Sequence, residues 1–122
     1  MPIIDVEIVA RADGAMPRGL AQSLADAVGR VLESPPAQTW VRVRFLARDH
    51  YAENDSLPES ADGPVFVTVL KRQLPRGQEI EAEIAALAGA VAGVVGRPVD
   101  RVHVEYAPAA AGRLAFGGKL VR

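Results

Sequence analysis

The feature of this chain that most restricts its possible folds is a pattern that occurs twice. Each half has a segment of alternating apolar and polar residues, then a helical segment that a proline ends, then a second alternating segment. The halves match at an offset of about sixty-one residues. Three aligned pairs illustrate the match: Val41 with Val102, Arg44 with Glu105, and Phe45 with Tyr106. The repeat predicts a duplicated β-α-β unit within one domain over residues 1–122.

The spacing of apolar residues also predicts where each element begins and ends. Pro17 suits the first turn of a helix, and the pair Gly117-Gly118 suits a hairpin turn. The predicted elements are, in chain order, a strand over 2–9, a helix over 17–33, a strand over 39–47, a polar loop over 48–63, a strand over 64–72, a helix over 78–95, a strand over 101–107 and a hairpin over 112–122.

Two β-α-β units imply a particular sheet. Each crossover should be right-handed and should join two parallel strands. Both helices then lie on one face of a four-stranded sheet, which is an α/β (α+β) fold. The other face mixes charges of both signs with apolar side chains, namely Ile3, Asp5, Glu7, Trp40, Arg42, Arg44, Arg101, His103 and Glu105. A solvated face would explain the charges. A subunit interface with paired charges would explain both kinds of residue, and we favour it.

Composition argues against several classes of function. The net charge of −1 gives no electrostatic basis for binding nucleic acid or an anionic membrane. The chain has no cysteine, and its two histidines lie far apart, which excludes disulfides and thiolate metal sites and argues against a zinc site. The most apolar helical run, over 84–95, is shorter than the about 20 residues that span a bilayer. No secretory signal is visible, so the cytoplasm is the expected location.

Pro2 has two possible explanations. Proline lacks a backbone donor, and the first position of a strand tolerates it. If Met1 is removed, however, Pro2 becomes a secondary amine at the end of the chain. Burial and nearby arginines would lower the pKa of that amine, and a base is most effective when its pKa lies near the working pH. The duplication and the arginines favour the catalytic interpretation.

Several stretches resemble the tautomerase superfamily. The initial proline, the tandem units and "VRVRF" (41–45) after a proline-ended helix carry the resemblance. "TWVRV" (39–43) is similar to the second strand of 4-oxalocrotonate tautomerase, and Arg42 matches its carboxylate-binding arginine. "GRLAFGG" (112–118) resembles that family's "GHFGIGG" ending, a hairpin near the active site. This resemblance implies that Leu114 and Phe116 are pocket walls or interface packing.

Other stretches resemble elements of the same superfamily. "RDHYAEN" (48–54) resembles a copy of the hairpin element, and Tyr51 falls where the family places a pocket phenylalanine. "VTVLKRQLPR" resembles a strand end of malonate semialdehyde decarboxylase and the cis-3-chloroacrylic acid dehalogenases. Arg72 and Arg76 match their two arginines, with "QLP" between them where the decarboxylase has one residue. The decarboxylase's aspartate aligns with Thr39, or with Gln38 after a one-residue shift, and neither residue can ionise.

Each matched residue also has a purely structural explanation. Arg42 could form an ion pair with Glu7 or Glu105 on the sheet. Tyr51 could be a loop aromatic, and Arg72 a solvated residue at a strand end. We expect His103 to be a residue of the sheet face and not a catalyst. Arg11 lies one residue from the arginine that 4-oxalocrotonate tautomerase uses in its first loop.

The resemblance implies a cofactor-independent tautomerase or isomerase that acts on a small 2-oxo or unsaturated carboxylate. Pro2 would be the general base, and Arg42, Arg72 and Arg76 would bind the carboxylate. Macrophage migration inhibitory factor is a further duplicated member of similar length, and the superfamily implies a homotrimer whose six units enclose a barrel. The alternatives are decarboxylation, hydration or dehalogenation of a small acid, or a noncatalytic trimeric binding protein of the same fold.

Overall fold

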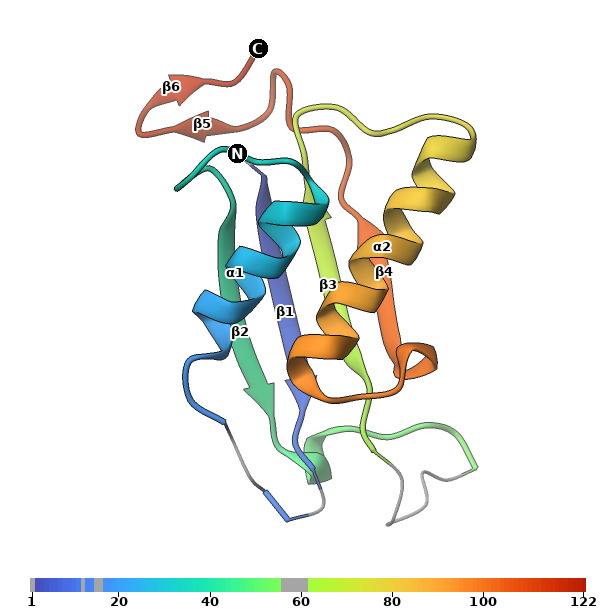
Figure 1. Cartoon of the computed structure of the whole chain (residues 1–122). Helices are drawn as coiled ribbons and strands as arrows, with labels where there is room; N and C mark the ends of the chain where they lie inside the picture. Colours follow the sequence, from blue (N-terminus) through green and yellow to red (C-terminus); the bar gives the residue numbers. More distant parts are fainter. Residues whose placement is uncertain (1, 12, 15–16, 56–61) are drawn as a thin grey trace.

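The computed structural model describes residues 2–11, 13–14, 17–55 and 62–122 (Figure 1). Met1 and part of the predicted 48–63 loop, residues 56–61, lie outside the described residues. The principal elements are the strands β1 (Ile3–Val9), β2 (Trp40–Leu46), β3 (Val65–Leu70) and β4 (Val102–Tyr106) and the helices α1 (Leu20–Val31) and α2 (Gln78–Val95). Shorter elements are the 3-10 helices η1 (Arg48–His50) and η2 (Val99–Arg101) and the strands β5 (Ala115–Phe116) and β6 (Lys119–Leu120).

The four longer strands form one mixed sheet in the order β2-β1-β3-β4. β1 is parallel to β2 and β3 is parallel to β4, so each half is a β-α-β unit, while β1 and β3 are antiparallel. Val6 and Val67, which are sixty-one residues apart, face each other at the centre of that antiparallel pair. The predicted α+β fold with two β-α-β units is therefore confirmed.

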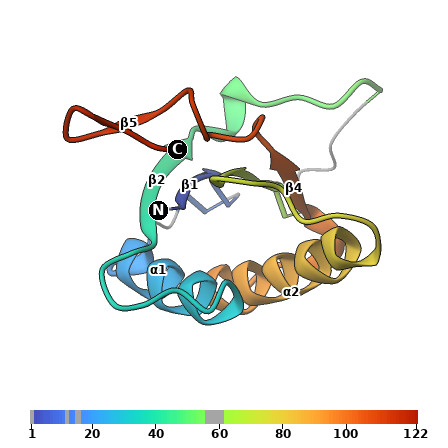
Figure 2. The ribbon, with the colours of Figure 1, turned by 90° about the horizontal axis from the view of Figure 1, so that it is seen from above.

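Both helices cover the same face of the sheet, as Figure 2 shows. Alternate residues of the central strands point toward the helices because side chains of a strand alternate between its faces. The core consists of residues that are at most 2% exposed, among them Ile4, Val6, Ile8, Val65, Val67 and Val69 from the strands and Leu24, Val28, Leu87 and Val91 from the helices. This apolar layer makes the register of β1 against β3 specific, because a shift of one residue would turn the apolar side chains to the other face.

The first helix is shorter than the sequence predicts. It begins at Leu20, because Gly19 adopts a left-handed conformation with φ 75° just before it, and Pro17 lies outside the helix. It ends at Val31, and Glu33 also has a positive φ. The second helix has the predicted bounds, and Gly96 caps its carboxyl end in the left-handed conformation.

The face of the sheet away from the helices is open in the single chain. Trp40 and Phe66 lie on it and are 54% and 37% exposed. Polar pairs cross it between neighbouring strands: Asp5 forms an ion pair with Arg42, and the Thr68 hydroxyl donates to Glu105. The β5-β6 hairpin and the segment after β2 both lie on this side (Figure 2). No helix of the described residues is long and apolar enough to cross a membrane.

Candidate active site

Pro2 lies at the end of the sheet where β1 begins and β3 ends. It is buried, and its carbonyl oxygen accepts a hydrogen bond of 3.0 Å from the backbone N–H of Trp40. Ile3 pairs with Leu70 across the antiparallel strands, so the same register places Pro2 opposite Lys71. We call this region the Pro2 end of the sheet. The hairpin and residue 122 lie at the same end (Figure 1).

Arg72 is held at the Pro2 end by the backbone around it. The carbonyl of Lys71 accepts the N–H of Ala110 at 2.8 Å, and the carbonyl of Arg72 accepts the N–H of Ala111 at 3.2 Å. The Nε of Arg72 donates to a backbone oxygen of Arg122, the last residue of the chain. Within the described residues, neither terminal nitrogen of the Arg72 guanidinium forms a hydrogen bond. The hydrogen bond of Nε therefore holds the guanidinium in place, while the N–H groups of its two terminal nitrogens can still donate to a ligand.

A cavity of about 480 Å³ lies beside Arg72, and it is lined by Ala37, Gln38, Trp40, Arg72, Phe116 and Val121. Trp40 and Phe116 form one wall, with their ring centroids 5.0 Å apart and their planes at 82°. This edge-to-face packing is a favourable arrangement of aromatic rings. The volume is typical of sites for small organic molecules. A cavity with an apolar wall and one guanidinium can bind a small carboxylic acid, with the carboxylate at the guanidinium and the carbon chain at the wall.

The predicted residues Leu114 and Arg76 lie near this end but outside the cavity lining. Leu114 supports the hairpin, because its carbonyl accepts the N–H of Val121 at 2.8 Å. Arg76 is exposed just before α2. No hydrogen bond or ion pair joins the Arg76 side chain to the described residues.

Arg42 lies on the open sheet face and forms an ion pair with Asp5. Its Nε and Nη2 donate to the two carboxylate oxygens at 2.6 and 2.9 Å. The hydrogen bond from Arg42 holds the pKa of Asp5 below its usual range, although partial burial acts in the opposite direction. The pairing follows from the register, which places Asp5 directly beside Arg42. An ion pair was one of the two sequence interpretations, but the partner is Asp5 and not Glu7 or Glu105.

Tyr51 lies at the opposite end of the sheet, after β2 and η1. Its hydroxyl donates to Glu53 at 2.7 Å, and Arg101 donates to the same carboxylate oxygen at 2.7 Å. Burial, followed by the bond to Glu53, raises the pKa of Tyr51. The ring also packs near Phe66, with centroids 6.1 Å apart. One protomer therefore does not bring Tyr51 together with Pro2.

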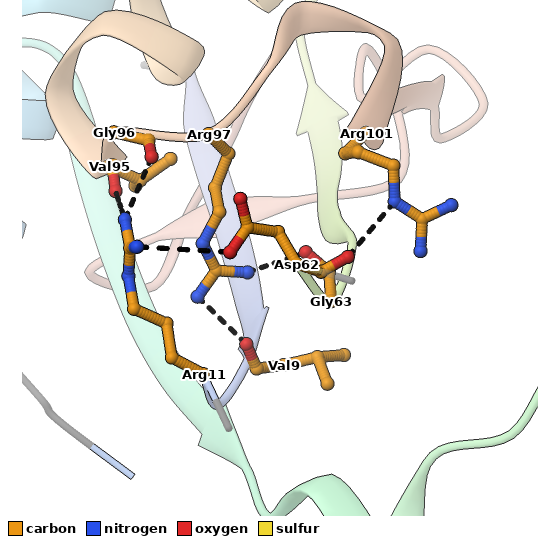
Figure 3. A network of polar contacts seen from close by, with 8 residues as sticks. All are labelled: Val9, Arg11, Asp62, Gly63, Val95, Gly96, Arg97 and Arg101. Atoms are coloured by element: carbon orange, nitrogen blue, oxygen red, sulfur yellow. Dashed lines mark hydrogen bonds and ion pairs between the residues drawn. The ribbon is translucent and has the colours of Figure 1, made fainter. Parts of the chain in front are cut away.

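A network of arginines occupies the opposite end of the sheet (Figure 3). Arg97 is only 7% exposed, and it donates to the carbonyls of Gly63 at 2.5 Å and Val9 at 2.9 Å. Burial and the nearby Arg11 charge lower the pKa of Arg97. Arg11 itself donates to the carbonyl of Gly96 at 2.8 Å. These arginines tie together the end of β1, the start of β3 and the carboxyl end of α2, which is a structural role.

Comparison with solved structures shows which fold this is. No family model matches the sequence, and no curated protein matches it. Native fused 4-OT superposes with a TM-score of 0.76 at 18% identity, covering 97% of this chain and 94% of that chain. A second fused 4-OT, a symmetric trimer, gives 0.73 at 21% identity, with 98% and 94% covered. This chain has the tautomerase fold.

The same fold occurs in other solved structures of similar length. The macrophage migration inhibitory factor of Trichinella spiralis superposes with a TM-score of 0.69 at 16% identity, covering 97% of this chain and 98% of that chain. The resemblance to long, duplicated tautomerases is thus confirmed for the fold. It extends over nearly the whole chain and not over one unit only.

Within the tautomerase fold, the predicted residues separate into three groups. Pro2, Arg72 and Phe116 lie at one end of the sheet, Arg42 lies on its open face, and Tyr51 lies at the other end. The sequence reasoning did not place Trp40 in the cavity. The sequence feature that could have indicated it is the position of Trp40 at the start of its strand, in "TWVRV". Trp40 pairs with Ile3 in the parallel strands, so it lies next to Pro2.

Proposed function

We propose that this chain is a cofactor-independent tautomerase that acts on a small 2-oxo or unsaturated carboxylate. Pro2 is the general base, once Met1 has been removed. The observation that supports this proposal most is the joint location of a buried Pro2, the Arg72 guanidinium and a small cavity at one end of the sheet. Its fold neighbours include fused 4-OT and macrophage migration inhibitory factor structures.

The reaction needs only a proton to move. The neutral Pro2 amine takes a proton from the carbon next to a carbonyl, and the electron pair of the C–H bond forms the enolate. The prolinium then returns the proton at another carbon or at oxygen, so atoms and charge balance without an added reactant. A well-placed general base contributes about 10²–10⁴-fold to the rate of such a step.

Arg72 supplies the positive charge that the substrate and the enolate need. A guanidinium presents paired donors that match a carboxylate. Its fixed position lets it stabilise the developing negative charge without reorganisation. Arg76 lies four residues further along the chain, exposed just before α2, and we propose it as a second donor to the substrate.

Arg42 and Tyr51 would contribute only in an assembly, because in their own chain they lie away from Pro2. We propose a homotrimer in which neighbouring protomers cover the open sheet face and complete each site with these residues. Two fused 4-OT neighbours are themselves a symmetric and an asymmetric trimer. The exposed aromatic side chains Trp40 and Phe66 support this assembly, because aromatic residues are enriched at protein interfaces.

The cavity favours isomerisation over water addition or decarboxylation assisted by an acid. Its lining holds no carboxylate among the described residues. Gln38, which occupies the lining, and Thr39 beside it cannot act as general acids or bases at neutral pH. A reaction that requires a second ionisable partner therefore finds none in this protomer's share of the pocket.

The deciding experiment combines intact mass with activity. Wild type and Pro2→Ala are compared for the tautomerisation of phenylpyruvate and 2-hydroxymuconate. We expect Met1 to be absent from the mass of the wild type and kcat/KM of Pro2→Ala to fall by at least about 10²-fold. The matched control is Pro64→Ala, which replaces the buried proline that precedes β3 and cannot become a terminal amine. A retained Met1, or equal activity of wild type and Pro2→Ala, would overturn the proposal.

An acetylenic 2-oxo acid gives a second readout of the same variants. One fold neighbour, Pt0534, is inactivated by 2-oxo-3-pentynoate. A neutral amine adds to such an activated triple bond, so a free Pro2 should gain one adduct, located by peptide mass spectrometry. Pro2→Ala carries only a primary, less nucleophilic terminal amine and should gain the adduct more slowly, while Pro64→Ala should react like wild type.

A further inference from the structure

A cluster of three side chains joins α2 to the Pro2 end of the sheet. The Lys71 ammonium lies 2.8 Å from one carboxylate oxygen of Glu83, and the Tyr106 hydroxyl donates to the other oxygen. The Lys71 and Glu83 side chains are only 24% and 17% exposed. Burial, together with the bond to Glu83, raises the pKa of Tyr106, so its hydroxyl keeps its proton and remains a donor. None of these three side chains has a role in the proposed reaction.

The sheet register brings the cluster beside Pro2. Ile3 pairs with Leu70, so Pro2 and Lys71 are opposite residues of antiparallel strands, whose Cα atoms lie about 5 Å apart. Both residues belong to the face that the helices cover, because Pro2 alternates with Ile4 and Lys71 with Val69, and these two are buried. A lysine side chain reaches about 6 Å from its Cα, so the ammonium lies within roughly 13 Å of the Pro2 nitrogen.

The other elements near Pro2 bring few competing charges. On the β2 side the adjacent residues are the uncharged Gln38 and Thr39. The carboxyl end of α1 carries Arg30 and the following Glu33, which have opposite signs. From α2 the facing acid is Glu83, while Glu79 and Glu81 are exposed. On the hairpin side the charges are Arg72, Lys119 and Arg122, which are also exposed. Lys71 and Glu83 are therefore the partly buried charges of this group.

We propose that Lys71 and Glu83 set the protonation state of the Pro2 amine. Lys71 disfavours the protonated amine because it places a like charge nearby, and Glu83 limits this effect because it neutralises Lys71. Tyr106 holds Glu83 in place through its hydroxyl. These residues act through Pro2 and do not touch the substrate. The inference rests on the proposed function in one respect, since it requires that Met1 is removed and Pro2 carries a free amine.

Opposite charge changes provide the test. Glu83→Gln leaves Lys71 uncompensated and should lower the pKa of the Pro2 amine. Lys71→Met leaves Glu83 and should raise that pKa. Each shift should be on the order of one pH unit, the size expected for unit charges about 10 Å apart at an effective dielectric constant of about 20. In the combined variant Lys71→Met with Glu83→Gln, the pKa of the Pro2 amine should be close to that of wild type. This variant also leaves no unpaired, partly buried charge that could destabilise the fold. The amine is followed through the carbon chemical shifts of the Pro2 ring between pH 4 and 10, in the absence of substrate.

Shifts of opposite sign support the inference, because a loss of packing alone would not reverse direction with the sign of the charge. Shifts of the same sign, or a Glu83→Gln protein that titrates like wild type, overturn it. Glu81→Gln is the matched control, since it removes the same charge from an exposed position of the same helix. If intact mass shows that Met1 is retained, the proposed function and this inference both fail. If the shifts are absent while Pro2→Ala is inactive, only this inference fails.

Discussion

At the scale of single residues, two charged pairs differ in how far water reaches them. Arg42 and Asp5 form a bidentate pair on the open face, where each side chain reaches solvent. Lys71 and Glu83 form a single contact in a more enclosed place beside Pro2. A charge in an enclosed site acts more strongly on its neighbours, because less water screens it. The second pair therefore has the greater influence on nearby ionisable groups.

The Asp5–Arg42 pair predicts a pH dependence of stability. The pKa of Asp5 is lowered in the folded chain, so its ionised form stabilises the fold above the ordinary aspartate pKa. This contribution is lost as the pH falls through the lowered value. We expect Asp5→Asn to have a lower Tm than wild type at pH 7, and the difference should shrink below about pH 4. Melting curves by circular dichroism between pH 7 and 2.5 measure it. A difference that stays constant over this range would contradict the prediction.

At the scale of elements, the sequence could predict the order of elements along the chain and the parallel pairing within each unit. It could not predict the antiparallel pairing of β1 with β3 or every boundary. Apolar alternation in 64–72 and helical spacing in 78–95 depend on local sequence, and both elements form. The start of α1 depends on Gly19, whose left-handed backbone separates Pro17 from the helix. The Lys71–Glu83–Tyr106 cluster could not be predicted, because it requires α2 to pack across the ends of β3 and β4. The opposition of Pro2 and Lys71 likewise depends on the β1-β3 register.

Alanine at two glycines, one at the junction of β1 and β3 and one in α2, should change the free energy of unfolding in opposite directions. A Cβ at Gly63 would lie 2.6 and 2.7 Å from the Cγ1 and Cβ of Val9, whereas a Cβ at Gly89 would meet nothing within 4 Å. Gly63→Ala should destabilise the fold by about 1–3 kcal/mol through overpacking. Gly89→Ala should stabilise it by about 0.5–1 kcal/mol, because alanine favours the helix. Urea titration of both variants gives the two free energies of unfolding, and equal values would contradict the clash.

At the scale of the whole molecule, the tautomerase fold of one chain leaves a sheet face uncovered. Helices protect one side of the sheet, while the other carries Phe66, Trp40 and paired charges. The described part of one protomer also gathers Pro2 and Arg72 but not Tyr51. Both observations are explained if protomers associate through this face.

The predicted assembly is a homotrimer of about three times 12.9 kDa. Light scattering coupled to size-exclusion chromatography measures this mass. Phe66→Asp places a charge on the open face and should give a monomer, and its tautomerase activity should fall because each site is then incomplete. Val99→Asp is the control, since Val99 is 56% exposed in η2, away from that face. A wild-type protein that elutes as a monomer would rule out the trimer.

The antiparallel pairing of β1 and β3 has a consequence for duplicated chains. Equivalent positions of the two halves lie at opposite ends of the sheet, so the start of β1 and the start of β3 are far apart. A linear chain has one amino terminus and can supply a terminal amine at only one of these ends. Fusing two units thus halves the number of possible amine bases per unit. At the other end of the sheet, Arg97 donates to backbone carbonyls of both halves and holds them together.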